Sequence, residues 1–264
     1  MQIISIINQK GGVGKTTTVI NLAAGLAEQE KRVLVIDLDP QGNATTGLGL
    51  SNLENSSNTI YGVLNGTKLI SEVTKKTQFK NLDIVTSNVD LSGLEVETAS
   101  DSRRAFILKR ELTPYLNDSK GNYDYILIDC PPSLSLLTVM ALVASHSLLV
   151  PLQTEFFALE GLTQLMKTIE RVKVNLNPEL KIRGILLTMF DKRNKLSSEV
   201  DSEARKYFKD KVYQTVIQRN VRLSEAPSHG LPCVIYDKNC VGSKSYFKLA
   251  EEFLKKNTTI ESAA

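Results

Sequence analysis

A group of glycines and lysines near the start of the chain has the residue types of a phosphate-binding loop. It reads Lys10-Gly-Gly-Val-Gly-Lys-Thr-Thr-Thr18 and follows the apolar run Ile3–Ile7. Glycines let the backbone bend until its N–H groups point inward at a phosphate, and a helix that begins there adds its positive end. Lys15 would then neutralise β- and γ-phosphates, and the Thr16 hydroxyl would bind Mg²⁺. The predicted chemistry is the binding of a nucleoside triphosphate.

Three aspartates stand where strands are expected to end. Asp37 and Asp39 follow a short apolar run, and residues two apart on an extended strand point the same way. Asp129 ends the run Tyr125–Ile128 and comes shortly before two prolines, the form of a Walker B strand that delivers one carboxylate to Mg²⁺. The alternative is that these acidic residues merely cap the turn after the strand. Beside a phosphate loop, we favour the chemical role.

The hydrophobic pattern predicts the elements that hold these residues. Strand-like apolar runs alternate with stretches of helical spacing, which predicts one α/β domain with a mostly parallel sheet covered on both faces. The expected strands are Ile3–Ile7, Val33–Ile36, Leu82–Val85, Tyr125–Ile128, Ser147–Leu152, Ile182–Leu187 and Val234–Tyr236, and the expected helices include Thr17–Leu26, Leu159–Val174 and Glu199–Phe208. Residues 47–66 are rich in turn formers and predict a surface loop with a short helix. The domain is expected to span residues 1–257, before a flexible tail at 258–264.

The phosphate loop departs from the usual pattern in an informative way. Gln9 stands where the first glycine is expected, and Lys10 precedes the glycines. This resembles the deviant Walker A motif of the ParA/MinD superfamily. Three later segments, Pro151–Leu162, Thr188–Arg193 and Arg219–Gly230, resemble the ParA/Soj chromosome-partitioning ATPases, and the similarity extends from Gln2 to about Leu254.

The resemblance implies a P-loop NTPase fold and a Mg²⁺-dependent ATPase. It implies an ATP-bound sandwich homodimer in which Lys10 reaches the partner's nucleotide, Asp39 orients or activates the attacking water, and Asp37 links to the magnesium shell. It further implies that the dimer binds double-stranded DNA without sequence preference. A ParB-type centromere-binding protein would stimulate hydrolysis and so release the DNA, which drives segregation of a chromosome or plasmid. A cytoplasmic, nucleoid-associated protein is expected.

The site residues follow from the motifs and from the matching positions. The catalytic candidates are Lys10, Lys15 and Asp39, and the metal candidates are Thr16, Asp37 and Asp129. The nucleotide-binding candidates are Lys10, Gly11, Gly12, Val13, Gly14, Lys15, Thr16 and Thr17, with Met189, Gln218 and Asn220 near the adenine. The family usually has proline at the position of Gln218, and Met189 would equally suit core packing. The DNA-binding candidates are Lys192, Arg193, Lys195, Arg219 and Arg222, whose cationic groups suit phosphates.

Composition and charge are consistent with a DNA-binding globular protein without a membrane span. Of 264 residues, 42% are hydrophobic and 23% charged, which is close to average usage. The apolar runs are far shorter than the roughly 18 residues of a spanning helix, and the amino terminus lacks the features of a signal peptide. The net charge is +3, but residues 181–248 contain 14 Lys and Arg against 7 Asp and Glu. Such a basic segment suits either DNA or a solvated surface.

Two rival functions use the same fold. A MinD-like membrane-cycling ATPase needs a basic amphipathic anchor, whereas the apolar stripe at 246, 249, 250, 253 and 254 has mixed charges around it and predicts domain packing, with no membrane partner. A metabolic ligase or reductase needs a substrate pocket or cluster cysteines. Cys130, Cys233 and Cys240 form no C-x-x-C motif, so they predict neither a disulfide framework nor a metal or redox site, but buried or incidental thiols.

Overall fold

One seven-stranded sheet runs through the part of the chain that the computed structural model describes, which is residues 1–50, 56–116 and 123–261. The strand order is β3-β4-β2-β5-β1-β6-β7. Every neighbouring pair is parallel except β3 and β4. The strands are β1 (Gln2–Ile6), β2 (Val33–Asp37), β3 (Thr74–Lys76), β4 (Leu82–Val85), β5 (Tyr125–Asp129), β6 (Ser147–Gln153) and β7 (Lys181–Thr188).

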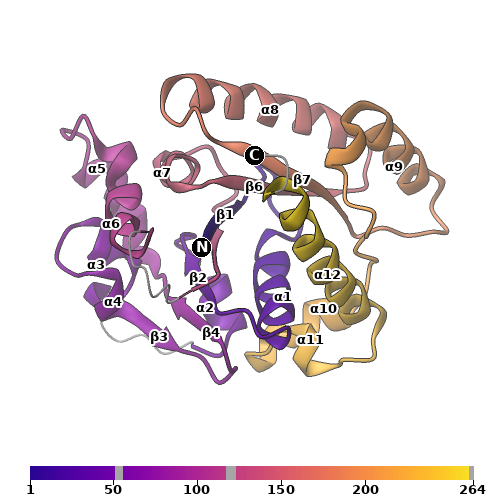
Figure 1. The fold of residues 1–264 in the computed structure, drawn as a ribbon, viewed down its shortest axis with the longest axis horizontal. Helices are drawn as coiled ribbons and strands as arrows, with labels where there is room; N and C mark the ends of the chain where they lie inside the picture. Colours follow the sequence, from indigo (N-terminus) through magenta and orange to yellow (C-terminus); the bar gives the residue numbers. More distant parts are fainter. Residues whose placement is uncertain (51–55, 117–122, 262–264) are drawn as a thin grey trace.

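Helices cover both faces of this sheet (Figure 1). They are α1 (Lys15–Glu28), α2 (Asn43–Gly47), α3 (Ile60–Leu64), α4 (Ile70–Val73), α5 (Leu94–Glu97), α6 (Ile107–Leu116), α7 (Leu136–Ala144), α8 (Ala158–Asn175), α9 (Lys195–Phe208), α10 (Arg222–Glu225), α11 (Cys233–Tyr236) and α12 (Val241–Glu261). The long helices α1 and α12 pack on one face together with α11, whereas α6, α7 and α8 pack on the other. The fold is therefore a three-layer α/β/α sandwich.

Alternation along the central strands explains the two cores. Successive side chains of a strand point to opposite faces. In β1, Ile4 and Ile6 are buried in the core with α1 and α12, whereas Ile3 is buried in the core with α6 and α7. Both faces of the strand must therefore be apolar, which is why it reads as a continuous hydrophobic run.

The predicted architecture is confirmed, with one strand wrong and one missed. Residues Val234–Tyr236 belong to the helix α11, not to a strand. A three-residue apolar run has no readable period, and Pro232 at the N-cap of α11 favours the start of a helix there. The missed strand is β3, an antiparallel edge strand whose Thr-Lys-Lys sequence carries no hydrophobic signal.

The predicted surface loop and tail are covered only in part. Within 47–66, residues 51–55 lie outside the described residues, and α3 is the expected short helix. Helix α12 continues to Glu261, so the first four residues of the expected tail are helical, and 262–264 lie outside the described residues. The domain boundary at residue 257 stays a prediction.

Candidate nucleotide site and basic surface

The phosphate loop connects the carboxyl end of β1 to the amino end of α1. Gly12 and Gly14 have φ angles of 74° and 89°, a region that residues with a side chain rarely adopt. Gly14 is the N-cap of α1. The N–H groups of the first helical turn therefore remain free of intrahelical partners and face the loop, as anion binding requires.

Two side chains that sequence reasoning missed fix this loop to neighbouring strands. Asn8 donates a hydrogen bond from Nδ2 to the carbonyl oxygen of Pro151 in β6 at 2.7 Å, and its Oδ1 accepts the N–H of Lys10 at 3.0 Å. Thr188, the last residue of β7, donates from Oγ1 to the carbonyl oxygen of Val13 at 2.8 Å. A polar residue at the end of a buried strand was the only signal for either role.

The two lysines of the motif point in different directions. Lys15 is 7% exposed and donates from Nζ to the carbonyl oxygen of Lys10 at 3.0 Å, so its ammonium lies within its own loop. Burial lowers the pKa of Lys15, and the nearby charge of Asp129 acts in the opposite direction. Lys10 instead forms an ion pair with Glu155, which follows β6, and its side chain is 54% exposed. Lys10 is thus directed away from its own phosphate loop.

Asp37 is buried at the end of β2, in register with Asp129 of β5. Its carboxylate accepts hydrogen bonds from the N–H and the hydroxyl of Thr45 at 2.8 and 2.7 Å, and from the N–H of Asp39 at 3.2 Å. Burial nevertheless raises the pKa of Asp37 to about 6, because desolvation outweighs these bonds. These bonds hold α2 against the sheet. Thr45, the donor in two of them, was not singled out from the sequence. Its link to magnesium stays a prediction.

Asp129 differs from Asp37 although it is equally buried. Neither of its oxygens has a partner at hydrogen-bonding distance among the described residues, although the Thr16 hydroxyl lies nearby. Burial, followed by repulsion from Asp37, raises the pKa of Asp129 well above its usual value. An unpaired buried carboxyl is costly, and carboxylate and hydroxyl oxygens are the ligands Mg²⁺ prefers. Asp129 and Thr16 therefore fit a magnesium ion.

Asp39 begins the turn that follows β2 and is only 6% exposed. Its Oδ1 accepts the N–H of Gln41 at 3.0 Å, so the side chain is held by its own turn. The carboxylate is near enough to affect the pKa of both Lys15 and Asp129. The carboxyl ends of β2 and β5 thus bring all three predicted aspartates to the phosphate loop, as the motif spacing indicated.

A cavity of about 420 Å³ opens beside the loop and collects the residues predicted to contact adenine. The loop and α1 contribute Gly14, Thr16 and Thr17, and the distant positions contribute Met189, Gln218 and Asn220. An isolated β-bridge between Phe190 and Gln218 joins the two distant segments. The cavity is also lined by residues that the sequence did not single out: Ile20, Asn43, Thr46, Thr188, Ile217, Leu223, Ser224, Pro227 and Tyr246.

A larger cavity, of about 710 Å³, lies away from this site. Its lining includes Arg32, Lys76 and Tyr123, which stand near the amino ends of β2, β4 and β5. None of the predicted nucleotide-binding residues lines it. The smaller cavity, which adjoins the phosphate loop, is therefore the candidate nucleotide site.

The five predicted DNA-binding residues lie on two adjacent exposed segments. One segment, from Lys192 to the start of α9, carries Lys192, Arg193 and Lys195, and the other carries Arg219 and Arg222. The bridge between Phe190 and Gln218 joins the segments. Arg219 is exposed and also lines the smaller cavity. The two segments that carry these cations therefore lie side by side next to the smaller cavity.

Carboxylates of the same segments pair with the two principal arginines. The Arg193 guanidinium contacts Asp191 at 2.9 Å and lowers the pKa of that carboxyl to about 2. Arg222 donates to Glu225 at 2.8 Å. The side chains of Arg193 and Arg222 are 91% and 51% exposed, so each ion pair can exchange for a phosphate at little cost.

Comparisons with known proteins identify the family. The model of the family described as "AAA domain" matches residues 1–182. The chain is 51% identical to the chromosome partitioning protein ParA of Caulobacter vibrioides over 97% of this chain and 95% of that protein. It is also 51% identical to the sporulation initiation inhibitor protein Soj of Bacillus subtilis, over 95% and 97% of the two chains. The chain belongs to the ParA/Soj family of partitioning ATPases.

A solved structure of a metabolic enzyme has a fold similar to that of this chain. The cobyrinic acid a,c-diamide synthase of Mycobacterium smegmatis, solved with an ATP analogue and magnesium, superposes with a TM-score of 0.82 at 34% identity, covering 97% of this chain and 95% of that one. A metabolic enzyme thus shares the architecture, but the ParA and Soj relatives are more similar in sequence. As a ParA/Soj protein, the chain is a P-loop ATPase with a role in partitioning.

The apolar residues of helix α12 belong to the core on one face of the sheet. The apolar stripe of α12 is domain packing, as predicted, since Tyr246, Leu249, Ala250 and Phe253 are all at most 1% exposed. Phe253 packs edge-on against Tyr125 of β5. Among the described residues, no helix has the length and apolar character needed to cross a membrane.

Proposed function

We propose that this chain is the DNA-partitioning ATPase of a segregation system. Its ATP-bound form is a sandwich homodimer that binds double-stranded DNA without sequence preference, and it associates with the nucleoid. A ParB-type centromere-binding protein stimulates hydrolysis, which separates the dimer and releases the DNA. Repeated binding and release then moves a chromosome or plasmid.

The observation that carries this proposal is the position of the cationic surface. Arg193 and Arg222 stand on segments that also supply Met189 and Asn220 to the nucleotide cavity. A nucleotide in that cavity contacts the same short segments as the DNA would. Binding of ATP and binding of DNA are therefore linked by a few residues of backbone.

The residues around the phosphate loop support hydrolysis by positioning and charge. Mg²⁺, held by Asp129 and Thr16, would neutralise charge on the phosphates. Lys15 exchanges the carbonyl oxygen of Lys10 for phosphate oxygens, and the free N–H groups of α1 bind them as well. Asp39 orients the attacking water. Lys10 leaves Glu155 to reach the nucleotide of the partner subunit, which makes hydrolysis depend on the dimer.

DNA affinity in this proposal depends on the dimer as well. The affinity of a protein for DNA rises steeply with the number of phosphates it neutralises. One subunit offers only the five candidate cations, and a dimer doubles them on one duplex. Binding should therefore require ATP and weaken as salt increases.

The test measures binding of a long DNA duplex by fluorescence anisotropy with ATP, with ADP and without nucleotide. We expect tight binding only with ATP. Arg222→Ala should lower the affinity equally for unrelated duplexes and reduce the salt slope by about one for each phosphate that is no longer neutralised, with ATP binding retained. The matched control is Arg110→Ala on α6, an exposed arginine away from this surface whose replacement removes the same charge.

Two results would refute the DNA assignment. One is equal binding of the native chain to DNA with ADP and with ATP. The other is unchanged ATP-dependent binding when Arg193 and Arg222 are both replaced by alanine. A ParB-type protein that leaves the ATPase rate unchanged in the presence of DNA would contradict the release step.

A further inference from the structure

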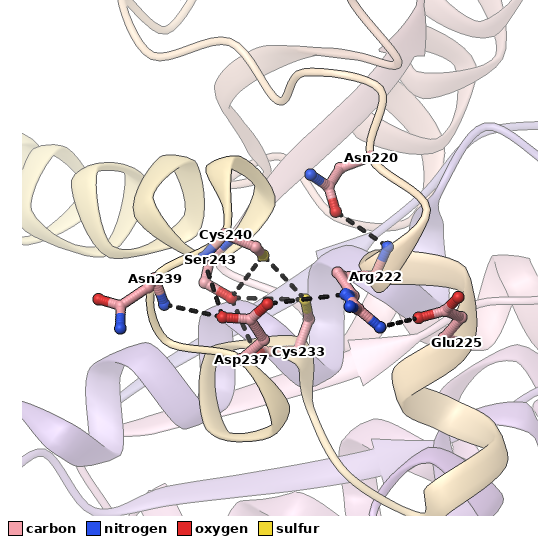
Figure 2. Close-up of polar contacts among 8 residues, drawn as sticks. All are labelled: Asn220, Arg222, Glu225, Cys233, Asp237, Asn239, Cys240 and Ser243. Carbon is pink, nitrogen blue, oxygen red and sulfur yellow. Dashed lines mark hydrogen bonds and ion pairs between the residues drawn. The ribbon is translucent and has the colours of Figure 1, made fainter.

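Two cysteines that are seven positions apart in the sequence lie side by side in the folded chain. Cys233 is the first residue of α11 and Cys240 directly precedes α12, and their Sγ atoms are 3.5 Å apart (Figure 2). A disulfide bond is about 2.05 Å long, so the two sulfurs need to approach by about 1.5 Å. The turn at residues 237–240 connects α11 to α12, so an adjustment of this turn would bring the two sulfurs together.

The two sulfurs differ in access and in their partners. Cys233 is fully buried, whereas Cys240 is partly exposed. The Cys240 sulfur accepts the N–H of Ser243 at 3.3 Å, in the first turn of α12. The hydroxyl of Ser243 accepts from the Cys240 thiol and donates to the Cys233 carbonyl oxygen. A reagent from solvent therefore meets Cys240 first, with Cys233 behind it.

We propose that Cys233 and Cys240 are a modification site, a dithiol that closes to an intramolecular disulfide on reaction with a low-molecular-weight disulfide. The Cys240 thiolate attacks one sulfur of the reagent, which forms a mixed disulfide and releases one reagent thiolate. Cys233 loses its proton to solvent and attacks the Cys240 sulfur, which releases the second reagent thiolate. The protein thiols lose two electrons and two protons, and the reagent is reduced to two thiols.

The second of these steps is the slower one. Burial raises the pKa of Cys233 to about 12, because its thiolate would lose solvation. Little Cys233 thiolate is present near neutral pH, and only the thiolate attacks. A mixed disulfide at Cys240 should therefore appear first and then disappear as the internal bond forms.

The turn between the cysteines also holds a carboxylate beside a candidate DNA contact. Asp237 accepts the N–H of Cys240 through Oδ1 at 3.1 Å, and its Oδ2 is 3.7 Å from Nε of Arg222 (Figure 2). A disulfide closes a loop that contains Asp237 and restricts its movement away from Arg222. A guanidinium held by a carboxylate is less available to a DNA phosphate. This coupling rests on the proposed DNA-binding function, whereas formation of the bond does not.

The bond is tested on the full chain by mass spectrometry. The reduced protein is incubated with oxidised glutathione, unfolded under acid conditions and alkylated. We expect the protein to lose the mass of two hydrogen atoms as the disulfide forms, and then to gain a single alkyl group, on Cys130. Dithiothreitol should restore all three thiols. Cys130→Ser should still close the bond. Cys233→Ser should instead stop at a stable glutathione adduct on Cys240, and Cys240→Ser should form neither product.

Three outcomes would overturn the modification site: a glutathione adduct that persists in the native chain, a disulfide between two chains, or three thiols that remain unmodified. The coupling to Arg222 is measured as DNA affinity with ATP. We expect a several-fold loss in the oxidised native chain and no change in Cys240→Ser after the same treatment. Equal affinities of the oxidised and reduced native chain overturn the coupling. Absence of ATP-dependent DNA binding in both forms overturns the proposed function, while the mass result still decides the disulfide.

Discussion

Two buried carboxyl groups, on Asp37 and Asp129, face the phosphate loop with different partners. Thr45 and the N–H of Asp39 satisfy Asp37, whereas Asp129 has no hydrogen bond at normal distance among the described residues. Ionisation of either group in the free protein is costly because both are desolvated. Both carboxyl groups therefore favour the protonated form in the free protein, and a cation beside Asp129 would favour its ionised form.

The raised pKa of Asp37 predicts a dependence of stability on pH. Its pKa is raised from 3.8 to about 6 on folding, so the folded chain binds this proton more tightly and loses stability as pH rises from about 4 to 6. Asp37→Asn removes the ionisation. Relative to the native chain, its free energy of unfolding should therefore rise by about 1 kcal/mol between pH 5 and pH 7.5. Urea denaturation measures it, with the exposed Asp101→Asn as the control; a constant difference would contradict the prediction.

Two substitutions at the site should separate binding from hydrolysis. Lys15→Ala removes the ammonium that faces the phosphates, and we expect the Kd for ATP to rise by about 100-fold or more. Asp39→Ala should leave that Kd nearly unchanged and slow hydrolysis by about 100-fold or more, because the attacking water loses its partner. The dimer should then persist. Equilibrium dialysis and phosphate release measure the two effects, and native turnover in Asp39→Ala would exclude a role in orienting water.

At the scale of elements, the segment that follows α9 packs closely against the backbone of β7. The register of β6 and β7 shifts at Leu148 and Leu149, so that Leu149 pairs with Gly184. The buried ring of Tyr213 packs directly on Gly184, where a Cβ would lie 2.4 Å from Cε2 of the ring. This contact positions the chain that leads to the bridge between Phe190 and Gln218.

Gly184→Ala should therefore destabilise the protein. Neither the backbone of β7 nor the buried ring can move easily, and we expect a loss of at least about 2 kcal/mol in the free energy of unfolding. Gly161→Ala in α8 is the matched control, because a Cβ there meets no atom within 4 Å. It should stabilise the helix by up to about 1 kcal/mol. Equal effects of the two substitutions in urea denaturation would show that the contact with Tyr213 is not rigid.

At the scale of the whole molecule, the ion pair between Lys10 and Glu155 would compete with the proposed dimer. Lys10 has to leave Glu155 before it can reach the nucleotide of a partner subunit. Both side chains are partly exposed, so this pair contributes less than about 1 kcal/mol. In the proposed cycle this cost is small enough for ATP to overcome, and it would favour the monomer when nucleotide is absent.

Glu155→Gln should strengthen the ATP-bound dimer. With the competing carboxylate removed, we expect the dimer Kd to fall by about two- to fivefold with a non-hydrolysable ATP analogue. Sedimentation equilibrium measures this change. Glu160→Gln, which makes the same charge change in α8, should leave the Kd unaltered. A weaker dimer in Glu155→Gln would mean that Glu155 contributes to the interface.

The sequence by itself determined the local chemistry and the layer architecture. A phosphate loop is continuous in the chain, so its glycines and Lys15 can be identified without any tertiary contact. The same holds for Asp129, because a buried parallel strand must be apolar along its length and its first carboxylate marks its end. The apolar runs predicted the parallel sheet. They failed where three residues, 234–236, were too few to show a period, and at β3, whose sequence carries no hydrophobic signal.

Only the tertiary structure decided which distant residues meet. The pairing of β6 with β7 and the bridge between Phe190 and Gln218 bring Met189 and Asn220 to the loop. Nothing in local spacing indicates the contacts of Asp37 with Thr45 or of Cys233 with Cys240, since both depend on how short helices are placed after a turn. Local sequence determines the local backbone conformation, because steric limits act between neighbouring residues. Contacts between distant elements depend instead on how the whole chain packs, and that packing is established only when the chain folds.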